Sequence, residues 1–143
     1  LDDALDAHAA YALPVARLAL GQALAPHVSA MMDVSDGLLI DAQRMAAASG
    51  LAVTLSLDAV PLSATFVRAY GADADAVLTA ATAGEDFELL FAAPAKAAAQ
   101  IFALSGQVGV AVARVGRVQQ GEGLQLQWRG DAVELPRKLG WTH

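Results

Sequence analysis

The sequence predicts an α+β domain with α/β-like layering, in which helices pack on a mixed β-sheet. Segments with helical periodicity interleave with short segments of strand periodicity along the chain, which is typical of a layered sheet. Two late strand patterns flank a short loop containing Gly121 and Gly123; this looks like a hairpin and indicates an antiparallel pair. The 143 residues, 56% of them hydrophobic, suffice for one core, so residues 1–143 are expected to form a single domain.

The first half of the chain predicts two helices, each followed by a strand. Residues 13–24 place apolar side chains among good helix formers, and Pro14 fits a first turn, where its missing N–H is not needed. A short apolar run within 29–33 is ended at once by turn residues, which favours a buried strand. Apolar residues recur at helical spacing in 37–48, and 51–57 alternates apolar and polar residues like a half-buried strand.

In the second half of the chain, helical spacing and strand alternation again predict the elements. An Ala-rich helical pattern is broken near Gly71, and the later strands are bounded by proline and glycine. The expected elements are helices within 62–83, a strand at 87–91, a helix at 95–104, strands at 111–118 and 124–128, and a polar tail from residue 131.

Composition excludes several classes of function. A net charge of −6 without clustered Lys or Arg argues against nucleic-acid binding. The chain has no cysteine, which excludes disulfides, zinc-thiolate sites and a thiol nucleophile and fits a cytoplasmic protein. Acidic residues near the start argue against a signal peptide, and the apolar stretch at 9–25 is too interrupted to span a membrane. The opening residues look like the middle of a longer protein.

An acidic turn, Asp33-Val34-Ser35-Asp36-Gly37, lies where a strand is expected to meet a helix. Unpaired N–H groups and the dipole at a helix start favour a phosphate, and nearby carboxylates favour Mg²⁺, which takes few protein ligands and completes its shell with water and phosphate oxygens. The alternative is local: Ser35 caps the helix and Asp36 complements its dipole. That alternative leaves Asp33 unexplained, because a charge ending an apolar strand needs a partner.

Two further features are candidates for a site. Gly84-Glu85-Asp86-Phe87-Glu88 crowds three carboxylates at the head of a strand, which requires solvent, a cation or basic groups; a solvated turn is the alternative. Trp141, close to the end of the sequence, either anchors a core or interface or stacks on a flat ligand ring. Neither a Walker phosphate loop nor a dinucleotide-binding glycine motif is present, so a complete nucleotide site is not visible.

Taken together, the motifs resemble the C-terminal half of thiamine-monophosphate kinase. The resemblance runs from about Pro14 to His143. It rests on Asp33-Val34-Ser35-Asp36-Gly37-Leu38, Leu57-Asp58-Ala59-Val60-Pro61-Leu62-Ser63, Gly84-Glu85-Asp86-Phe87-Glu88-Leu89-Leu90-Phe91 and Gly140-Trp141-Thr142-His143. Two positions depart from the family pattern: Ala83 replaces a glycine, and Ala16 replaces a proline.

The resemblance implies ATP-dependent phosphorylation of thiamine monophosphate to thiamine diphosphate with several Mg²⁺ ions. Asp33 and Asp36 are then magnesium ligands, Ser35 contacts ATP, and Glu85 and Trp141 bind thiamine monophosphate, with Asp86 in support. No residue acts as a nucleophile, since phosphoryl transfer depends on positioning and charge neutralisation.

The resemblance also implies that a partner half is missing. In the family an N-terminal half supplies further aspartates, much of the ATP site and the interface of a homodimer. This chain alone is therefore expected to fold without catalysing. The alternative function is a non-catalytic binding or regulatory module with the same fold.

Overall fold

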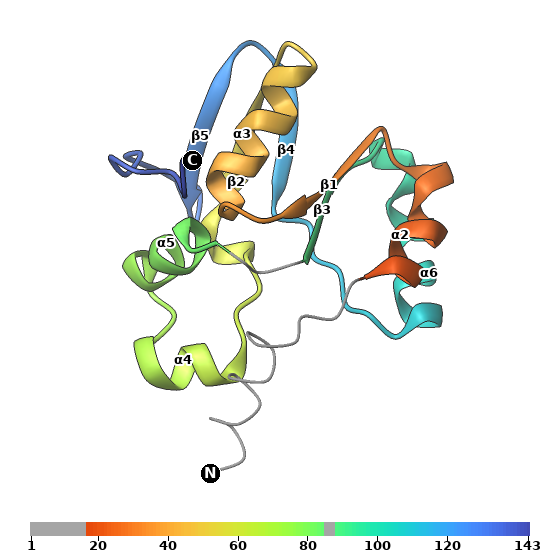
Figure 1. The fold of residues 1–143 in the computed structure, drawn as a ribbon, viewed down its shortest axis with the longest axis horizontal. Coiled ribbons are helices and arrows are strands. Elements are labelled where there is room, and N and C mark those ends of the chain that lie inside the picture. Colours follow the sequence, from red (N-terminus) through yellow and green to blue (C-terminus); the bar gives the residue numbers. More distant parts are fainter. Residues whose placement is uncertain (1–16, 85–87) are drawn as a thin grey trace.

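The computed structural model describes residues 17–84 and 88–143, whose strands form two sheets (Figure 1). In the smaller sheet, β1 (Ala30–Val34) and β3 (Glu88–Ala92) pair antiparallel. The larger sheet has the order β4-β2-β5-β6 and is mixed, since β2 is antiparallel to β4 and parallel to β5. Its strands are β2 (Leu51–Ser56), β4 (Gly116–Gln120), β5 (Gly123–Trp128) and β6 (Asp131–Val133).

Helices cover both sheets, which confirms the predicted α+β class with a mixed sheet. The α-helices are α2 (Leu18–Leu24), α3 (Leu38–Ala48), α4 (Ala64–Tyr70), α5 (Ala74–Thr82) and α6 (Ala98–Val108). Single 3-10 turns occupy Ala25–His27, Leu57–Ala59 and Ala95–Ala97. Within the described ranges, every helix is too short or too polar to cross a membrane.

The main core lies between α3, α5 and the larger sheet. Leu39 from α3, Leu55 from β2 and Leu57 just after β2 are each 2% exposed or less. A second cluster joins α2 and α6 through Leu20, Leu24 and Ile101, with side chains of β3 packed against it. Because α3 contacts β2, β5 and also β1, it links the larger sheet to the smaller one.

The predicted hairpin at Gly121 and Gly123 is wrong. β4 and β5 do not pair with each other but lie on opposite sides of β2, with Gln120 opposite Leu51 and Gly123 opposite Ala52. The two-residue link therefore crosses the start of β2. Gly121 and Gly123 adopt φ values of 121° and 89°, which side chains disfavour, so the glycines permit a crossing rather than a tight turn. The strand predicted at 111–118 begins only at Gly116.

The hairpin of the larger sheet instead joins β5 to β6. β6 lies in the segment from residue 131 that was expected to be a polar tail without a strand. Arg129 and Gly130 form its two-residue loop with φ values of 50° and 90°, the positive pair found in type I′ turns. An arginine there is not a usual turn signal. Asp58 stabilises this turn, because its Oδ1 accepts a hydrogen bond from the Arg129 N–H at 2.9 Å.

We expect Leu39→Ala to lower the free energy of unfolding by about 2–5 kcal/mol, because it leaves a cavity where α3 meets the sheet. The matched control is Leu18→Ala in α2, whose side chain is 71% exposed and whose loss should change stability by less than about 0.5 kcal/mol. Urea unfolding followed by circular dichroism measures both. An equal loss of stability in the two variants would show that α3 does not pack on the sheet through Leu39.

Candidate functional site

The acidic turn connects β1 to α3. Val34, the last residue of β1, is buried, and α3 begins at Leu38 with Gly37 as its N-cap. No side chain caps this helix, so the interpretation of Ser35 as an N-cap is wrong. Gly37 has a φ of 126°, and a Cβ there would lie 3.0 Å from the carbonyl oxygen of Ala83, so the turn packs tightly against the end of α5.

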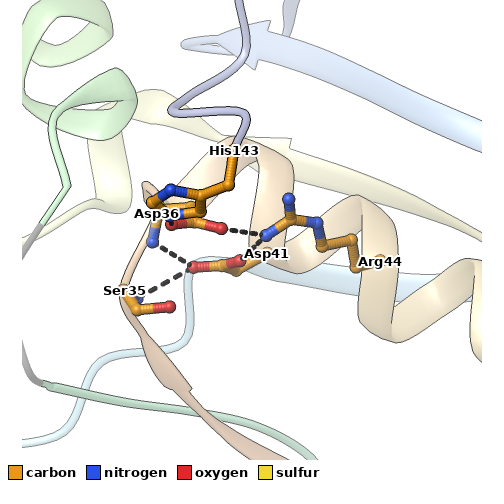
Figure 2. A network of polar contacts seen from close by, with 5 residues as sticks. All are labelled: Ser35, Asp36, Asp41, Arg44 and His143. Atoms are coloured by element: carbon orange, nitrogen blue, oxygen red, sulfur yellow. Dashed lines mark hydrogen bonds and ion pairs between the residues drawn. The ribbon is translucent and has the colours of Figure 1, made fainter.

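A buried carboxylate organises the turn from inside (Figure 2). Asp41 is fully buried, and its Oδ2 accepts hydrogen bonds from the backbone N–H groups of Ser35 at 2.9 Å and Asp36 at 3.1 Å. Those two N–H groups are therefore already paired. The expectation that the N–H groups of this turn receive a phosphate is wrong for these two residues, and the turn presents its side chains instead.

Asp36 is held ionised by a cation. Arg44 Nη1 donates to Oδ2 of Asp36 at 2.5 Å and to Oδ1 of Asp41 at 3.0 Å, bridging the two carboxylates. The hydrogen bond from Arg44 is the main reason that the pKa of Asp36 lies below its ordinary value. His143 Nε2 lies 3.2 Å from the other oxygen, Oδ1, and lowers this pKa further.

The C-terminal tail lies directly on the acidic turn. The Trp141 N–H donates to the carbonyl oxygen of Asp36 at 2.8 Å. A Cβ on Gly140 would lie 2.3 Å from that same oxygen and 2.5 Å from Cγ2 of Ile40, so only glycine fits between tail and turn. The acidic turn and the C-terminal tail, which lie far apart in the sequence, thus share one site.

Trp141 extends from the tail over a third segment. A Cβ on Gly84 would lie 2.9 Å from Cδ1 of Trp141 and 2.7 Å from the carbonyl oxygen of Ser35. The Trp141 side chain is 58% exposed, and Lys138 Nζ lies 4.4 Å from its ring centroid. Exposure this large excludes a core anchor. The ring thus has surface available for another contact.

The replacement of a family glycine by Ala83 does not disturb this arrangement. Ala83 has φ −70° and ψ 149°, an extended conformation that any residue adopts. Its carbonyl oxygen lies against the acidic turn at Gly37.

Glu85 and Asp86 lie outside the described residues, but both flanks of their segment border the acidic turn. On one side Gly84 touches Ser35, and on the other Glu88 stands opposite Val34 in the β1–β3 ladder. Glu88 is also paired with Arg17, with Nε–Oε2 and Nη2–Oε1 distances of 3.0 and 2.7 Å. The two described ends of the second acidic motif, Gly84 and Glu88, therefore lie beside the acidic turn.

Asp33 differs from its expected setting. It lies opposite Leu89 in β1, and its residue is exposed to solvent, so the argument that a buried charge needs a partner does not apply. Among residues 17–84 and 88–143, no three acidic or histidine side chains gather into a group that could hold a metal.

Sequence reasoning missed Asp41, Arg44 and Lys138. In the helical pattern of 37–48, neither Asp41 nor Arg44 belongs to the recurring apolar positions, yet Asp41 is fully buried. A signal existed: Asp41 and Arg44 have the i, i+3 spacing of a helical ion pair beside an acidic turn. Lys138 gave no signal, since its partner Trp141 is recognised only once the tail is placed.

Comparison with known proteins confirms the resemblance noted from the motifs. The family model described as "AIR synthase related protein, C-terminal domain" matches residues 3–129. Thiamine-monophosphate kinase from Caulobacter vibrioides is 32% identical over 136 residues, which cover 93% of this chain and 38% of the relative. The chain spans about two fifths of the length of the curated relatives that it matches.

Solved structures agree with this match. Thiamine-monophosphate kinase from Stenotrophomonas maltophilia superposes with a TM-score of 0.82 at 32% identity, covering 93% of this chain and 41% of that chain. AaThiL, solved in complex with AMPPCP and TMP, gives a TM-score of 0.73 at 27% identity and covers 98% of this chain and 42% of its own. This chain therefore belongs to the family of AIR synthase related proteins and carries their C-terminal domain.

Proposed function

We propose that this chain is the C-terminal domain of a thiamine-monophosphate kinase, which transfers the terminal phosphoryl group of ATP to thiamine monophosphate. The observation that carries the proposal is the hydrogen bond from Trp141 N–H to the Asp36 carbonyl, because it joins an acidic turn, whose carboxylates can hold a cation, to an exposed aromatic ring. The similarity to kinases of this name, one of them solved with AMPPCP and TMP, supports it.

In this proposal Asp33 and Asp36 bind Mg²⁺ and Ser35 contacts ATP. Carboxylate oxygens are the ligands that Mg²⁺ prefers, and one or two from the protein suffice when water and phosphates complete the shell. Asp36 is ionised at neutral pH, but Arg44 and His143 lie at its two oxygens, so a bound Mg²⁺ has to displace or share these contacts. The turn carries three carboxylates, Asp33, Asp36 and Asp41, and one guanidinium, Arg44. Its net charge is therefore negative, which attracts a cation.

Glu85 and Trp141 bind thiamine monophosphate in this proposal, with Asp86 in support. A cationic thiazolium ring is well served by an acidic side chain and an aromatic face. The half-exposed ring of Trp141 beside Gly84 supports a substrate position next to the acidic turn. Lys138 already covers the Trp141 ring at 4.4 Å, so a cationic substrate ring has to displace it or use the opposite face.

The chemistry assigned to this chain is positioning and charge neutralisation. Mg²⁺, when bound, neutralises charge on the phosphates. Ser35 orients the ATP phosphates, and Glu85 and Trp141 hold the ring of thiamine monophosphate so that its phosphate lies near them. No protein nucleophile is required, since the phosphoryl group passes directly between substrates.

The rest of the site is assigned to an N-terminal half. Because the chain spans about two fifths of its relatives, we propose that this half supplies further aspartates, much of the ATP site and the interface of a cytoplasmic homodimer. The isolated chain then folds but does not turn over.

The proposal is tested with the full-length protein that contains this chain. We expect it to convert thiamine monophosphate to thiamine diphosphate with ATP and Mg²⁺, whereas the 143-residue chain shows no turnover. Asp36→Ala and Asp33→Ala should each lower kcat/KM by at least about 100-fold, since a metal ion supplies several kcal/mol of transition-state stabilisation. The control is Glu122→Ala in the exposed link between β4 and β5.

Product formation is measured by chromatography. Normal turnover by both aspartate variants would contradict the assigned metal ligands. A full-length protein without any turnover would favour the alternative, a non-catalytic binding module of the same fold.

We expect Gly140→Ala to push the tail off the acidic turn, because its Cβ would lie 2.3 Å from the Asp36 carbonyl oxygen. In the full-length protein the KM for thiamine monophosphate should rise more than the KM for ATP, since Trp141 moves with the tail. Gly106→Ala in α6 is the control, because nothing lies within 4 Å of its added Cβ. An unchanged KM for thiamine monophosphate in Gly140→Ala would contradict the placement of Trp141 at the substrate.

We expect Arg44→Gln to raise the pKa of Asp36, because the hydrogen bond from Arg44 is the main cause of its depression. A folded-state pKa below the ordinary 3.8 stabilises the fold above that pH, and this stabilisation is lost as the pH falls through the folded pKa. The stability gap between wild type and variant should therefore narrow in acid.

Carboxyl NMR titration without divalent ions measures the Asp36 pKa directly. Arg117→Gln on β4 is the control, since Arg117 bonds Gln119 and not the acidic turn. If the pKa of Asp36 stays low in Arg44→Gln, a group other than Arg44 lowers it.

A further inference from the structure

Asp41 is the one fully buried charged side chain of the described residues, and nothing above gives it a role in phosphoryl transfer. It lies in the first turn of α3. A buried carboxylate is destabilising unless hydrogen bonds and a counter-charge satisfy it. Asp41 has both: its hydrogen bonds come from two N–H groups of the acidic turn and from Arg44, which bridges it to Asp36.

The two backbone bonds of Asp41 fix the orientation of the turn. Both N–H groups, from Ser35 and Asp36, converge on the single oxygen Oδ2 at 2.9 and 3.1 Å. Two consecutive peptide planes that share one acceptor cannot rotate independently. The directions in which the Ser35 and Asp36 side chains leave the backbone are therefore set by Asp41.

The third bond of Asp41 extends this control to the Asp36 side chain. Arg44 Nη1 binds Oδ1 of Asp41 and Oδ2 of Asp36 together, as Figure 2 shows. Asp36 is thus held at its backbone by Asp41 and at its carboxylate through Arg44. The Asp41 side chain is 1% exposed against 13% for Asp36, so Asp41 itself is shielded from any ligand that Asp36 meets.

We infer that Asp41 is a positioning residue for the proposed reaction: it holds Ser35 and Asp36 in the orientation that Mg²⁺ and the ATP phosphates require. The inference rests on the proposed function. It differs from a purely structural role, in which Asp41 stabilises the start of α3 without affecting metal binding. A structural role changes the melting temperature alone, whereas a positioning role changes the Mg²⁺ dependence of the folded enzyme.

The test is a graded series at position 41 in the full-length protein. Asp41→Ala removes both oxygens, and the half-saturating Mg²⁺ concentration should rise by about 10–100-fold, the usual effect of losing a group that orients a metal ligand. Asp41→Asn keeps one oxygen that can still accept both N–H groups, so it should recover part of the loss. The KM for thiamine monophosphate should change little, because Glu85 and Trp141 are assigned to that substrate.

The matched control is the same pair of substitutions at Asp75. Asp75 occupies the first turn of α5, as Asp41 does in α3, but it is exposed. Asp75→Ala and Asp75→Asn should leave the Mg²⁺ dependence unchanged.

A second measurement does not require activity. Amide hydrogen exchange at Ser35 and Asp36, followed by NMR, should be slow in the wild type, faster in Asp41→Asn and fastest in Asp41→Ala. Loss of exchange protection together with a raised Mg²⁺ requirement supports the inference.

Other outcomes overturn it. A lower melting temperature with an unchanged Mg²⁺ requirement makes Asp41 a structural residue only. If Asp41→Ala does not fold, Asp41→Asn decides, and unchanged Mg²⁺ dependence and amide exchange in that variant reject the inference. A wild type without kinase activity rejects the proposed function instead, and the exchange data then still show whether Asp41 holds the turn.

Discussion

Close backbone packing around the Asp36 carbonyl is the constraint on which the site depends. That oxygen accepts the Trp141 N–H at 2.8 Å and lies where a side chain at Gly140 would need to be. The other side of the turn meets the end of α5 at Gly37 with similarly little space. Three distant segments can approach this closely only where side chains are absent. Gly37, Gly84 and Gly140 therefore allow the acidic turn, the end of α5 and the tail to lie in contact.

Helix α3 serves the core and the site at once. Leu39, Ala42 and Ala46 bury one side of it in the main core, while its first turn supplies Asp41 to the acidic turn. The turn is consequently anchored to the main core rather than to a free loop, which limits its local unfolding. Rigidity of this kind suits a reaction in which catalysis consists of holding charges at fixed positions.

Local periodicity predicted much of the fold, and long-range pairing explains most of what it missed. The helix at 37–48 and the strand at 51–57 were recognised within about a residue of α3 and β2, because apolar spacing reports the local backbone directly. The partners of a strand leave no such record, so the order β4-β2-β5 was mistaken for a hairpin. The motifs likewise identified the acidic turn, but not that Asp41 and Arg44 connect beneath it, since buried polar pairing depends on the tertiary structure.

The position of β2 has a consequence for synthesis. Both of its neighbours, β4 and β5, come more than fifty residues later in the chain, and the link between them closes over its start. During translation β2 has no strand partner until residues 116–128 have left the ribosome, and contacts of such long sequence separation slow folding. Over that interval an apolar strand with two open edges is exposed to other chains, so the nascent protein is prone to aggregate until β4 and β5 emerge.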